Sequence, residues 1–423
     1  MKPFWTDLQE EWHTRRWFRV LLTIAAAWSL ARLGLQASVL FSGNENQAAI
    51  DLQVYLDASR HFIEGAALYP TSLEILEYHF PYPPIFACLF APFLWLPAQV
   101  NIALQLLLHI AAYIALFAAW RRIFAFCELD HANRMLILTL PVWLVFSPFW
   151  DDLGYLNIYT IMALLGTLLI EAILKQNLAQ AILWLTFILV TKPQWAFAAA
   201  IPLLFKHYRF FFKMLIGALL SYLILAGITA LVGGSAYVVG QFREYIGLLA
   251  RLGREFPYRG PESGFLGYNH SIKQIFAFML GPSEAILRLA TAIKVILLIP
   301  LGILCLRLFS KRDGNITPAV ALEIALLLYL GAFIWLDVLW EAFLTIAIYA
   351  YLVSAADRKW TVVLSIFFLA YALLDPIRAI LYVVGPPMIQ DSYLPWDYSI
   401  YIPTTMLTIL ANYSWLLKQR WHD

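Results

Sequence analysis

The sequence is poor in charged residues. Only 13% of its 423 residues are Asp, Glu, Lys or Arg, whereas a soluble protein carries about 25%. Hydrophobic residues make up 62% of the chain, and apolar runs long enough to cross a bilayer recur along all of it. This composition excludes a soluble globular protein. It predicts an all-α polytopic membrane protein, because a helix satisfies its backbone hydrogen bonds within one segment.

Cysteine and long polar stretches are scarce as well. The three cysteines, Cys88, Cys127 and Cys305, have unrelated spacings and match neither a metal motif nor a disulfide framework. The first apolar run, about 17–41, is too long for the core of a cleavable signal peptide. Since no stretch is long and polar enough to form a soluble domain, we predict a single integral membrane domain over residues 1–423.

Basic residues occur in clusters between the apolar runs. Arg15, Arg16 and Arg19 precede the first run, and further clusters lie at 121–134, 175, 206–213, 307–312, 358–359 and 418–420. Lys and Arg are enriched in cytoplasmic loops. If all these clusters are cytoplasmic, the chain crosses the membrane about twelve times and has both termini in the cytoplasm.

The predicted crossings differ in length. Ten of them lie near 17–40, 100–120, 134–149, 157–174, 213–233, 285–309, 317–335, 340–356, 360–382 and 398–417. Two shorter ones, 179–190 and 194–206, are separated by Lys192 and Pro193. Segment 82–97 contains prolines at four positions, so we expect it to be re-entrant or a half-helix instead of another crossing.

Two of the segments predicted to face outward are long, namely 42–81 and 234–284. Shorter outer segments are expected at 150–157, 336–341 and 383–397. A simple channel does not need outer loops of this size. They suggest chemistry, or capture of a ligand, at the outer membrane surface.

The first outer loop opens with an amphipathic helix, predicted over Ile50 to Glu64. One of its sides is apolar and consists of Leu52, Tyr55, Leu56, Phe62 and Ile63, a pattern typical of a helix that lies on the membrane surface. Asp57 and His61 are expected to pair on the other side. Asp51 falls in the first turn, where it either caps free amide groups or has a catalytic role. A second helix is expected to start with a capping box at 71–74.

Five stretches, taken in order, resemble a known family. They are "DLQVYLDASRHFIEGAALY" (51–69), "YPPIFACLFAPFLWLP" (82–97), "LGYLNIYTIMALLG" (153–166), "TKPQWAFAAAIPLLF" (191–205) and "GYNHSIKQIF" (267–276). Together they resemble the GT-C class of membrane glycosyltransferases, and most closely glycosyltransferase family 87. That family includes polyprenol-phosphate-mannose-dependent mannosyltransferases.

The resemblance implies a GT-C fold, a lipid-linked sugar donor at the outer leaflet, and a catalytic carboxylate at Asp51 that acts as the general base. The phosphate of such a donor leaves as a stable anion. The reaction therefore needs one base for the acceptor hydroxyl and cations for the phosphate. Direct displacement would invert the anomeric centre. No motif demands a metal, and we expect no metal and no cofactor.

Five cations are candidates for contacts with the donor phosphate: Lys192, Arg251, Arg254, Arg259 and Lys273. Lys192 lies between two apolar half-helices, where an unpaired charge is costly. It is interpreted as a phosphate contact or, alternatively, as a lysine that reaches the membrane interface. The other four belong to the outer segment 234–284, where the alternative is a solvated loop with partly paired charges.

Seven residues are predicted to contact substrate: Tyr55, Tyr82, Asn157, Asn269, His270, Asp337 and Glu341. His270 either orients the acceptor and shares a proton with Asp51, or is an ordinary surface histidine. Asp151 and Asp152 either bind the sugar or a divalent cation, or are solvated.

The largest departure from the family is "WLDVLWEAFL" (335–344). Many members have a Trp-x-His-His pattern there, whereas this chain has Glu341 after Trp340 and no histidine. Asp337 and Glu341 have an i,i+4 spacing, which predicts one helical face that holds acceptor hydroxyls or a second base. Mannose is therefore not assumed to be the sugar.

Three functions are compatible with this pattern. The first is transfer of one sugar, mannose or another hexose or pentose, from a polyprenyl-phosphate donor to a lipid or glycan acceptor. The reaction would occur at the outer face of the cytoplasmic membrane, with membrane lipids and no nucleic acid as partners. The second is a transporter or flippase of a lipid-linked or amphipathic anion, although no internal repeat is visible. The third is a relative that has lost its activity.

Overall fold

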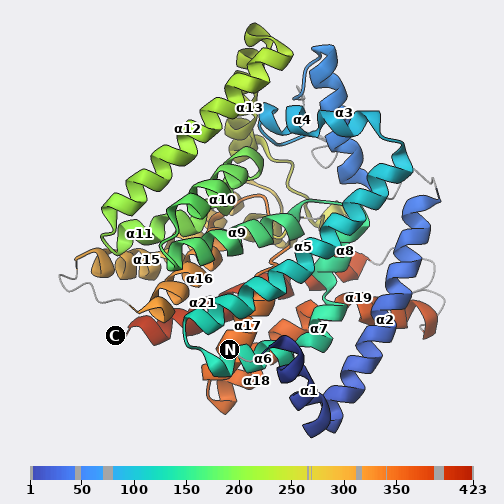
Figure 1. Cartoon of the computed structure of the whole chain (residues 1–423), viewed down its shortest axis with the longest axis vertical. Helices are drawn as coiled ribbons and strands as arrows, with labels where there is room; N and C mark the ends of the chain where they lie inside the picture. The colour runs from blue at the N-terminus through green and yellow to red at the C-terminus, as the bar shows by residue number, and fades with distance from the viewer. Residues whose placement is uncertain are drawn as a thin grey trace. The chain divides into compact units, whose positions relative to one another are not determined.

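A computed structural model describes residues 3–42, 49–69, 80–263, 266–267, 269–310, 317–339, 341–384 and 395–421. All regular elements among these residues are helices, with no strand among them (Figure 1). This confirms the prediction of an all-α protein. The chain forms two compact units, and each consists of segments that are discontinuous in the sequence. The prediction of a single membrane domain stays a prediction.

Unit 1 comprises residues 1–36, 117–151 and 258–423. Its helices are α1 (Phe4–Thr14), most of α2 (Arg16–Phe41), the end of α5 (Ala98–Phe126), α6 (Asp130–Leu138), α7 (Leu140–Val145), the first part of α8 (Ser147–Tyr155), η4 (Pro261–Ser263), α14 (Ile272–Leu280), α15 (Glu284–Ser310), α16 (Pro318–Trp335), α17 (Thr345–Ala355), α18 (Arg358–Ala372), α19 (Leu374–Val384) and α21 (Pro395–Trp421). Helix α17 packs against α6 and α18, and α21 packs against α16 and α18. Most of α16 is buried, so this helix forms the centre of the unit.

Unit 2 comprises residues 37–116 and 152–257. Its helices are the end of α2, α3 (Ile50–Glu64), α4 (Pro84–Phe90), η2 (Ala91–Trp95), the first part of α5, the end of α8, α9 (Tyr159–Leu174), α10 (Leu178–Thr191), η3 (Pro193–Ala200), α11 (Ile201–Leu204), α12 (Tyr208–Gly233) and α13 (Ser235–Glu255). Helix α10 packs against both α9 and α12, and α3 packs against α4 and η2 (Figure 1).

Among the described residues, five helices are long and apolar enough to cross a membrane: α2, α5, α12, α15 and α16. Two further spans are possible, each formed by consecutive helices with a bend between them, which would raise the number to seven. One is α6 with α7 and α8, bent by 48°, and the other is α18 with α19, bent by 57°. The chain is therefore a polytopic membrane protein. The larger number of twelve crossings stays a prediction, because the remaining apolar helices are shorter than the ~20 residues that a perpendicular span needs.

The predicted break at Lys192 is present. Helix α10 ends at Thr191, and the 3₁₀ helix η3 begins at Pro193, because proline has no N–H with which to continue the hydrogen-bond ladder. Lys192 itself has a non-helical backbone, with ψ of 88°. In segment 82–97, α4 and η2 have 7 and 5 residues. This is too short to cross the ~30 Å hydrocarbon core.

Helix α3 matches its predicted bounds, and its buried residues include Leu52, Tyr55 and Phe62. It ends at Gly65, which has φ of +70°, a conformation that favours glycine. The predicted pairing of Asp57 with His61 is wrong. Asp57 accepts a hydrogen bond of 2.6 Å from Arg60, one residue closer along the helix. The predicted capping box at 71–74 lies outside the described residues.

Segment 234–284, predicted to face outward, is largely helical, since α13 and α14 lie within it. The side chain of Gln241 on α13 accepts a 2.9 Å hydrogen bond from the amide of Leu68. The hydroxyl of Tyr237 donates to the carbonyl of Ala66 at 2.7 Å. These bonds attach α13 to the segment that follows α3.

The prediction of one helical face for Asp337 and Glu341 is wrong. Helix α16 ends at Trp335 and α17 begins at Thr345, so both acids lie in a non-helical connection. Asn269 stabilises the non-helical conformation of this connection by donating a 2.8 Å hydrogen bond to the carbonyl of Asp337. It also accepts from the amide of Leu339 at 3.1 Å. These long-range bonds outweigh the local helical periodicity.

Candidate active site

Asp51 lies in the first turn of α3 and is half-buried. The amide of Ala49, just before the helix, donates a 3.3 Å bond to the carbonyl of Gly154, which places the start of α3 beside the 152–157 segment of unit 2. Three neighbouring groups interact electrostatically or by hydrogen bonding with the Asp51 carboxyl, namely Lys192, Asp152 and the side chain of Asn157. The carboxylate is thus next to a cation and a polar amide, and not only at a helix end.

Burial raises the pKa of the Asp51 carboxyl to about 7. The Lys192 ammonium opposes this shift, the negative charge of Asp152 adds to it, and a hydrogen bond from Asn157 opposes it. A carboxyl with a pKa near neutrality can both accept and release a proton at physiological pH. This is the behaviour expected of a general base.

Lys192 is buried at the tip between α10 and η3. Its ammonium nitrogen lies 3.6 Å from the centroid of the Tyr159 ring and 5.2 Å from that of Tyr82. Burial lowers the pKa of Lys192, whereas Asp51 and Asp152 raise it. A bound anion would favour the charged form in the same way. This geometry differs from that of a lysine extended to the membrane interface, because the ammonium group is enclosed by aromatic faces.

Tyr55, Tyr82 and Asn157 form one hydrogen-bonded cluster. The Tyr55 hydroxyl donates to Oδ1 of Asn157 at 3.2 Å and lies 3.1 Å from the Tyr82 hydroxyl. Tyr69 donates to the carbonyl of Tyr82 at 2.7 Å. All four side chains are buried. The structure thus brings together three residues that the sequence predicted separately as substrate contacts, although no substrate is present to test that role.

Asp152 is fully buried, so the alternative of a solvated residue is wrong. Its carboxylate accepts from the amides of Tyr159 at 3.1 Å and Thr160 at 3.0 Å, and from the Thr160 hydroxyl at 2.5 Å. These amides belong to the first turn of α9, where no intrahelical acceptor exists. His109 lies 3.8 Å away on α5. Asp152 therefore fixes the start of α9, which carries the Tyr159 ring to Lys192.

Unit 1 contains a second charged cluster, centred on Asp337. Its carboxylate forms ion pairs with Lys273, at 2.7 Å, and with Lys294. Lys294 is buried on α15, and its ammonium lies 5.4 Å from the centroid of the Trp335 ring. Asp337 is thus engaged by two lysines, and the cluster of two cations and one anion carries a net positive charge. Phosphate binding by Lys273 and substrate binding by Asp337 stay predictions.

Asn269 and His270 are both buried in unit 1. The side chain of Asn269 forms hydrogen bonds with backbone groups, and one of them is accepted from the amide of Ser271 at 3.0 Å. In the structure Asn269 therefore positions the connection after α16. His270 is not a surface histidine. Burial lowers its pKa to about 3, so the ring is neutral at physiological pH. Contact of either residue with substrate stays a prediction.

The remaining predicted residues have less defined surroundings. Glu341 is buried and accepts a 2.8 Å bond from the Tyr371 hydroxyl. Arg251 is half-buried on α13. The side chain of Arg254 lies outside the described residues. The backbone of Arg259 exchanges two bonds with the side chain of Gln274, at 3.1 and 3.3 Å. These residues stay predictions as phosphate or acceptor contacts.

Sequence reasoning missed four residues that build these clusters: His109, Tyr159, Thr160 and Lys294. His109 and Lys294 had a usable signal, since each is a polar or charged residue within an apolar span. Tyr159 and Thr160 had none, because aromatic and hydroxyl residues are common near helix starts. Within the described part of the chain, no three His, Cys, Asp or Glu side chains lie close enough together to hold a metal ion.

The profile of glycosyltransferase family 87 matches residues 80–334. This is more than half of the chain, and the protein therefore belongs to glycosyltransferase family 87. The matched region includes Tyr82, Asn157 and Lys192, whereas Asp51 and Asp337 lie outside it. None of the curated proteins and none of the solved structures that were compared matches this chain.

Proposed function

We propose that this glycosyltransferase moves one sugar, mannose or another hexose or pentose, from a polyprenyl-phosphate donor to a lipid or glycan acceptor. The reaction takes place at the outer face of the cytoplasmic membrane and inverts the anomeric centre. The proposal includes a GT-C fold with about twelve membrane helices and with both termini in the cytoplasm. Membership of the family supports the general activity, and the rest is supported by the chemistry of the Asp51 region.

In the proposed reaction, Asp51 removes the proton from the acceptor hydroxyl. The hydroxyl oxygen then forms a bond to the anomeric carbon while the bond from that carbon to the phosphate oxygen breaks. The departing polyprenyl phosphate keeps the electron pair, and Lys192 stabilises its charge. No second carboxylate is required as a general acid, because phosphate is a good leaving group.

The observation that carries the proposal is that Asp51 and Lys192 lie close enough in unit 2 for each charge to shift the pKa of the other. A base and a cation must act on the two sides of the same anomeric carbon, so they are expected to lie close together. The aromatic rings of Tyr82 and Tyr159 lie around the Lys192 ammonium and stabilise this cation where the donor phosphate is expected.

Asp51→Asn is the decisive variant. We expect it to lower sugar transfer by about a hundred- to ten-thousandfold, the usual effect of removing a general base. The assay follows a radiolabelled sugar from a panel of polyprenyl-phosphate sugars in membranes that contain the wild type or the variant. The same panel identifies the sugar.

Asp57→Asn provides a matched control on the same helix. Asp57 is exposed and pairs only with Arg60 among the described residues, so its substitution is expected to leave transfer within about twofold of wild type. Full transfer by a folded Asp51→Asn protein would remove Asp51 from the mechanism. Absence of transfer with every donor from folded wild type would contradict the proposed donor class.

A further inference from the structure

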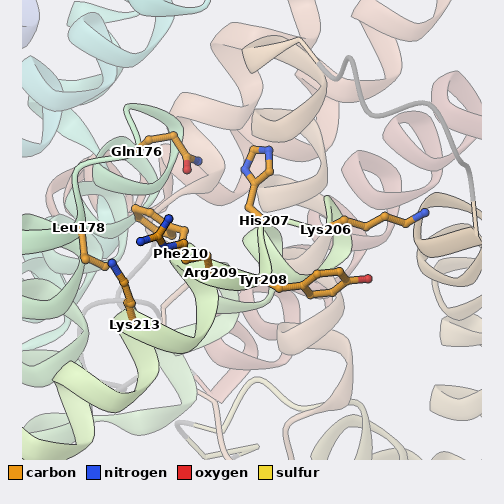
Figure 2. A pocket seen from close by; sticks show the side chains of 8 residues that line it. All are labelled: Gln176, Leu178, Lys206, His207, Tyr208, Arg209, Phe210 and Lys213. Carbon is orange, nitrogen blue, oxygen red and sulfur yellow. The ribbon is translucent and has the colours of Figure 1, made fainter.

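A basic pocket lies in unit 2, between the connection from α9 to α10 and the start of α12. Its volume is about 640 Å³, and it is lined by Gln176, Leu178, Lys206, His207, Tyr208, Arg209, Phe210 and Lys213. Three of these residues are Lys or Arg, and none is acidic. Figure 2 shows Arg209 and Lys213 directed toward the side where Gln176 and Leu178 lie, whereas Lys206 and Tyr208 point to the opposite side.

Arg209 and Lys213 form a pair of like charges. They are four residues apart on α12, so their side chains are neighbours on the helix surface, an arrangement that is unfavourable without an anion. Neither one has an acidic partner within the described ranges. The nearest lysine in the α9–α10 connection, Lys175, has one, because it pairs with Glu171 at 2.7 Å. The pocket therefore combines unneutralised positive charge with space for a ligand.

The face of α12 that begins with these two cations continues as an exposed apolar stripe. Ile216, Leu220 and Leu223 follow Lys213 at spacings of three and four residues, which keeps them on one side of the helix. Each of the three is more than half exposed. Only 11% of the apolar stretch of α12 is buried in the protein. A cationic end followed by an apolar stripe fits a ligand that has an anionic head and acyl chains.

The pocket is separate from the candidate active site. It lies at the start of α10, whereas Lys192 lies at the end of that helix. Helix α10 has 14 residues, which corresponds to about 21 Å. One head group cannot contact both places. In the predicted topology the pocket faces the cytoplasmic leaflet, and the lipid-linked donor is expected at the opposite one.

We propose that this pocket binds the phosphate of an anionic phospholipid from the bilayer leaflet at this end of α12. The phosphate lies between Arg209 and Lys213, the amide of Gln176 faces the polar head group, and the acyl chains follow Ile216, Leu220 and Leu223. The apolar stripe favours a phospholipid over a free phosphate ester, because a soluble anion gains nothing from it. This inference does not depend on the proposed transfer reaction.

Binding of dioleoylphosphatidylglycerol to the purified full-length protein tests the proposal. Native mass spectrometry in detergent measures lipid occupancy for the wild type, R209Q/K213Q, R209K/K213R and K175Q. Each basic residue contributes about fivefold to the affinity for an anionic lipid, so R209Q/K213Q is expected to bind about 25-fold more weakly. R209K/K213R is expected to retain binding. K175Q removes one charge from the same α9–α10 connection, where the lysine already pairs with Glu171, and is expected to stay within about twofold of wild type.

Two further measurements on the wild type identify the ligand. Dioleoylphosphatidylcholine should bind at least about tenfold more weakly than the anionic lipid, and millimolar glycerol 3-phosphate should not displace the anionic lipid. Equal affinity for both lipids, or equal binding by wild type and a folded R209Q/K213Q protein, would overturn the proposal. Displacement by glycerol 3-phosphate would assign the pocket to a soluble phosphate ester and overturn the lipid assignment.

Discussion

Asp51 is subject to opposing electrostatic effects. Burial and Asp152 raise the pKa of its carboxyl, and Lys192 and Asn157 lower it, with a result of about 7. A base is active only in its deprotonated form. The rise of transfer with pH should therefore report the environment of this one side chain.

We expect kcat/KM to rise with pH up to about 7 and to fall above it, because burial lowers the pKa of Lys192 to about 7 and only its charged form stabilises the phosphate. Below the raised pKa, Asp51 carries a proton and cannot accept another, so the rate should fall about tenfold for each pH unit. Initial rates between pH 5 and 8 measure this profile, and Asp57→Asn should give the same one. A rate that is constant from pH 5 to 8 would show that no group with a raised pKa limits the reaction.

Lys192→Met should weaken transfer and also move the pH profile. Loss of the ammonium removes a contact to the donor phosphate, and we expect kcat/KM to fall by about a hundredfold. Since Lys192 lowers the pKa of Asp51, the midpoint of the rising part of the profile should move to higher pH. Lys175→Met, which removes a lysine that pairs with Glu171, should change neither quantity. A hundredfold loss with an unchanged midpoint would separate Lys192 from Asp51.

At the residue scale, sequence reasoning singled out Asp51 and Lys192 but not their neighbours. Lys192 stood out as a charge between two apolar half-helices, and Asp51 through the family resemblance of the first predicted outer loop. That Asn157, Tyr82 and Tyr55 form one cluster could not be predicted, because these contacts join residues far apart in the chain. Asp337 shows the same limit, since two lysines on other helices decide its role.

At the scale of elements, the start of α9 depends on a side chain from outside the helix. Asp152 accepts hydrogen bonds from two amides and one hydroxyl in the first turn of α9. Tyr159, at that turn, is the ring closest to Lys192 among the described contacts. Helix α9 is thus positioned by a buried carboxylate, and not by its own N-cap residue, which has no side-chain cap bond.

Asp152→Ala should destabilise the protein by about 2–3 kcal/mol, because it leaves buried amides without an acceptor. Thermal unfolding in detergent measures the loss as a lower Tm. Hydrogen exchange at the first turn of α9 should also accelerate. Asp57→Ala, at an exposed position, should change the stability by less than about 0.5 kcal/mol. An unchanged Tm in the Asp152 variant would show that α9 holds its place without this cap.

Helix boundaries set by proline and glycine were predictable, and those set by tertiary bonds were not. The break at Pro193 and the end of α3 at Gly65 follow from backbone chemistry alone. The connection after α16 has no such signal. Its helical periodicity is overridden by Asn269, which bonds to backbone groups of Asp337 and Leu339.

At the scale of the whole molecule, orientation in the membrane is the feature most open to test. The basic clusters predict that the α9–α10 connection is cytoplasmic and that α3 faces outward. Both Glu64, at the end of α3, and Gln176, in that connection, are exposed. Each can carry a single cysteine once Cys88, Cys127 and Cys305 are replaced by alanine.

We expect a membrane-impermeant maleimide to label Glu64→Cys in intact cells and Gln176→Cys only after permeabilisation. The physical reason is the excess of Lys and Arg on the Gln176 side. Labelling of both variants after permeabilisation is the control for reactivity. If the two positions exchange their behaviour, the orientation is reversed, and the proposed site on the outer face would be wrong.

Helix α10 connects the two charged places of unit 2, Lys192 at its end and the basic pocket at its start. Its peptide dipoles add up to about half a positive charge at Leu178 and half a negative charge at Thr191. The negative end directly precedes Lys192 in the chain and favours the charged form of its side chain. The positive end lies beside Arg209 and Lys213 and adds to their attraction for an anion. One helix of 14 residues therefore contributes a partial positive charge to the basic pocket and a partial negative charge to the surroundings of Lys192.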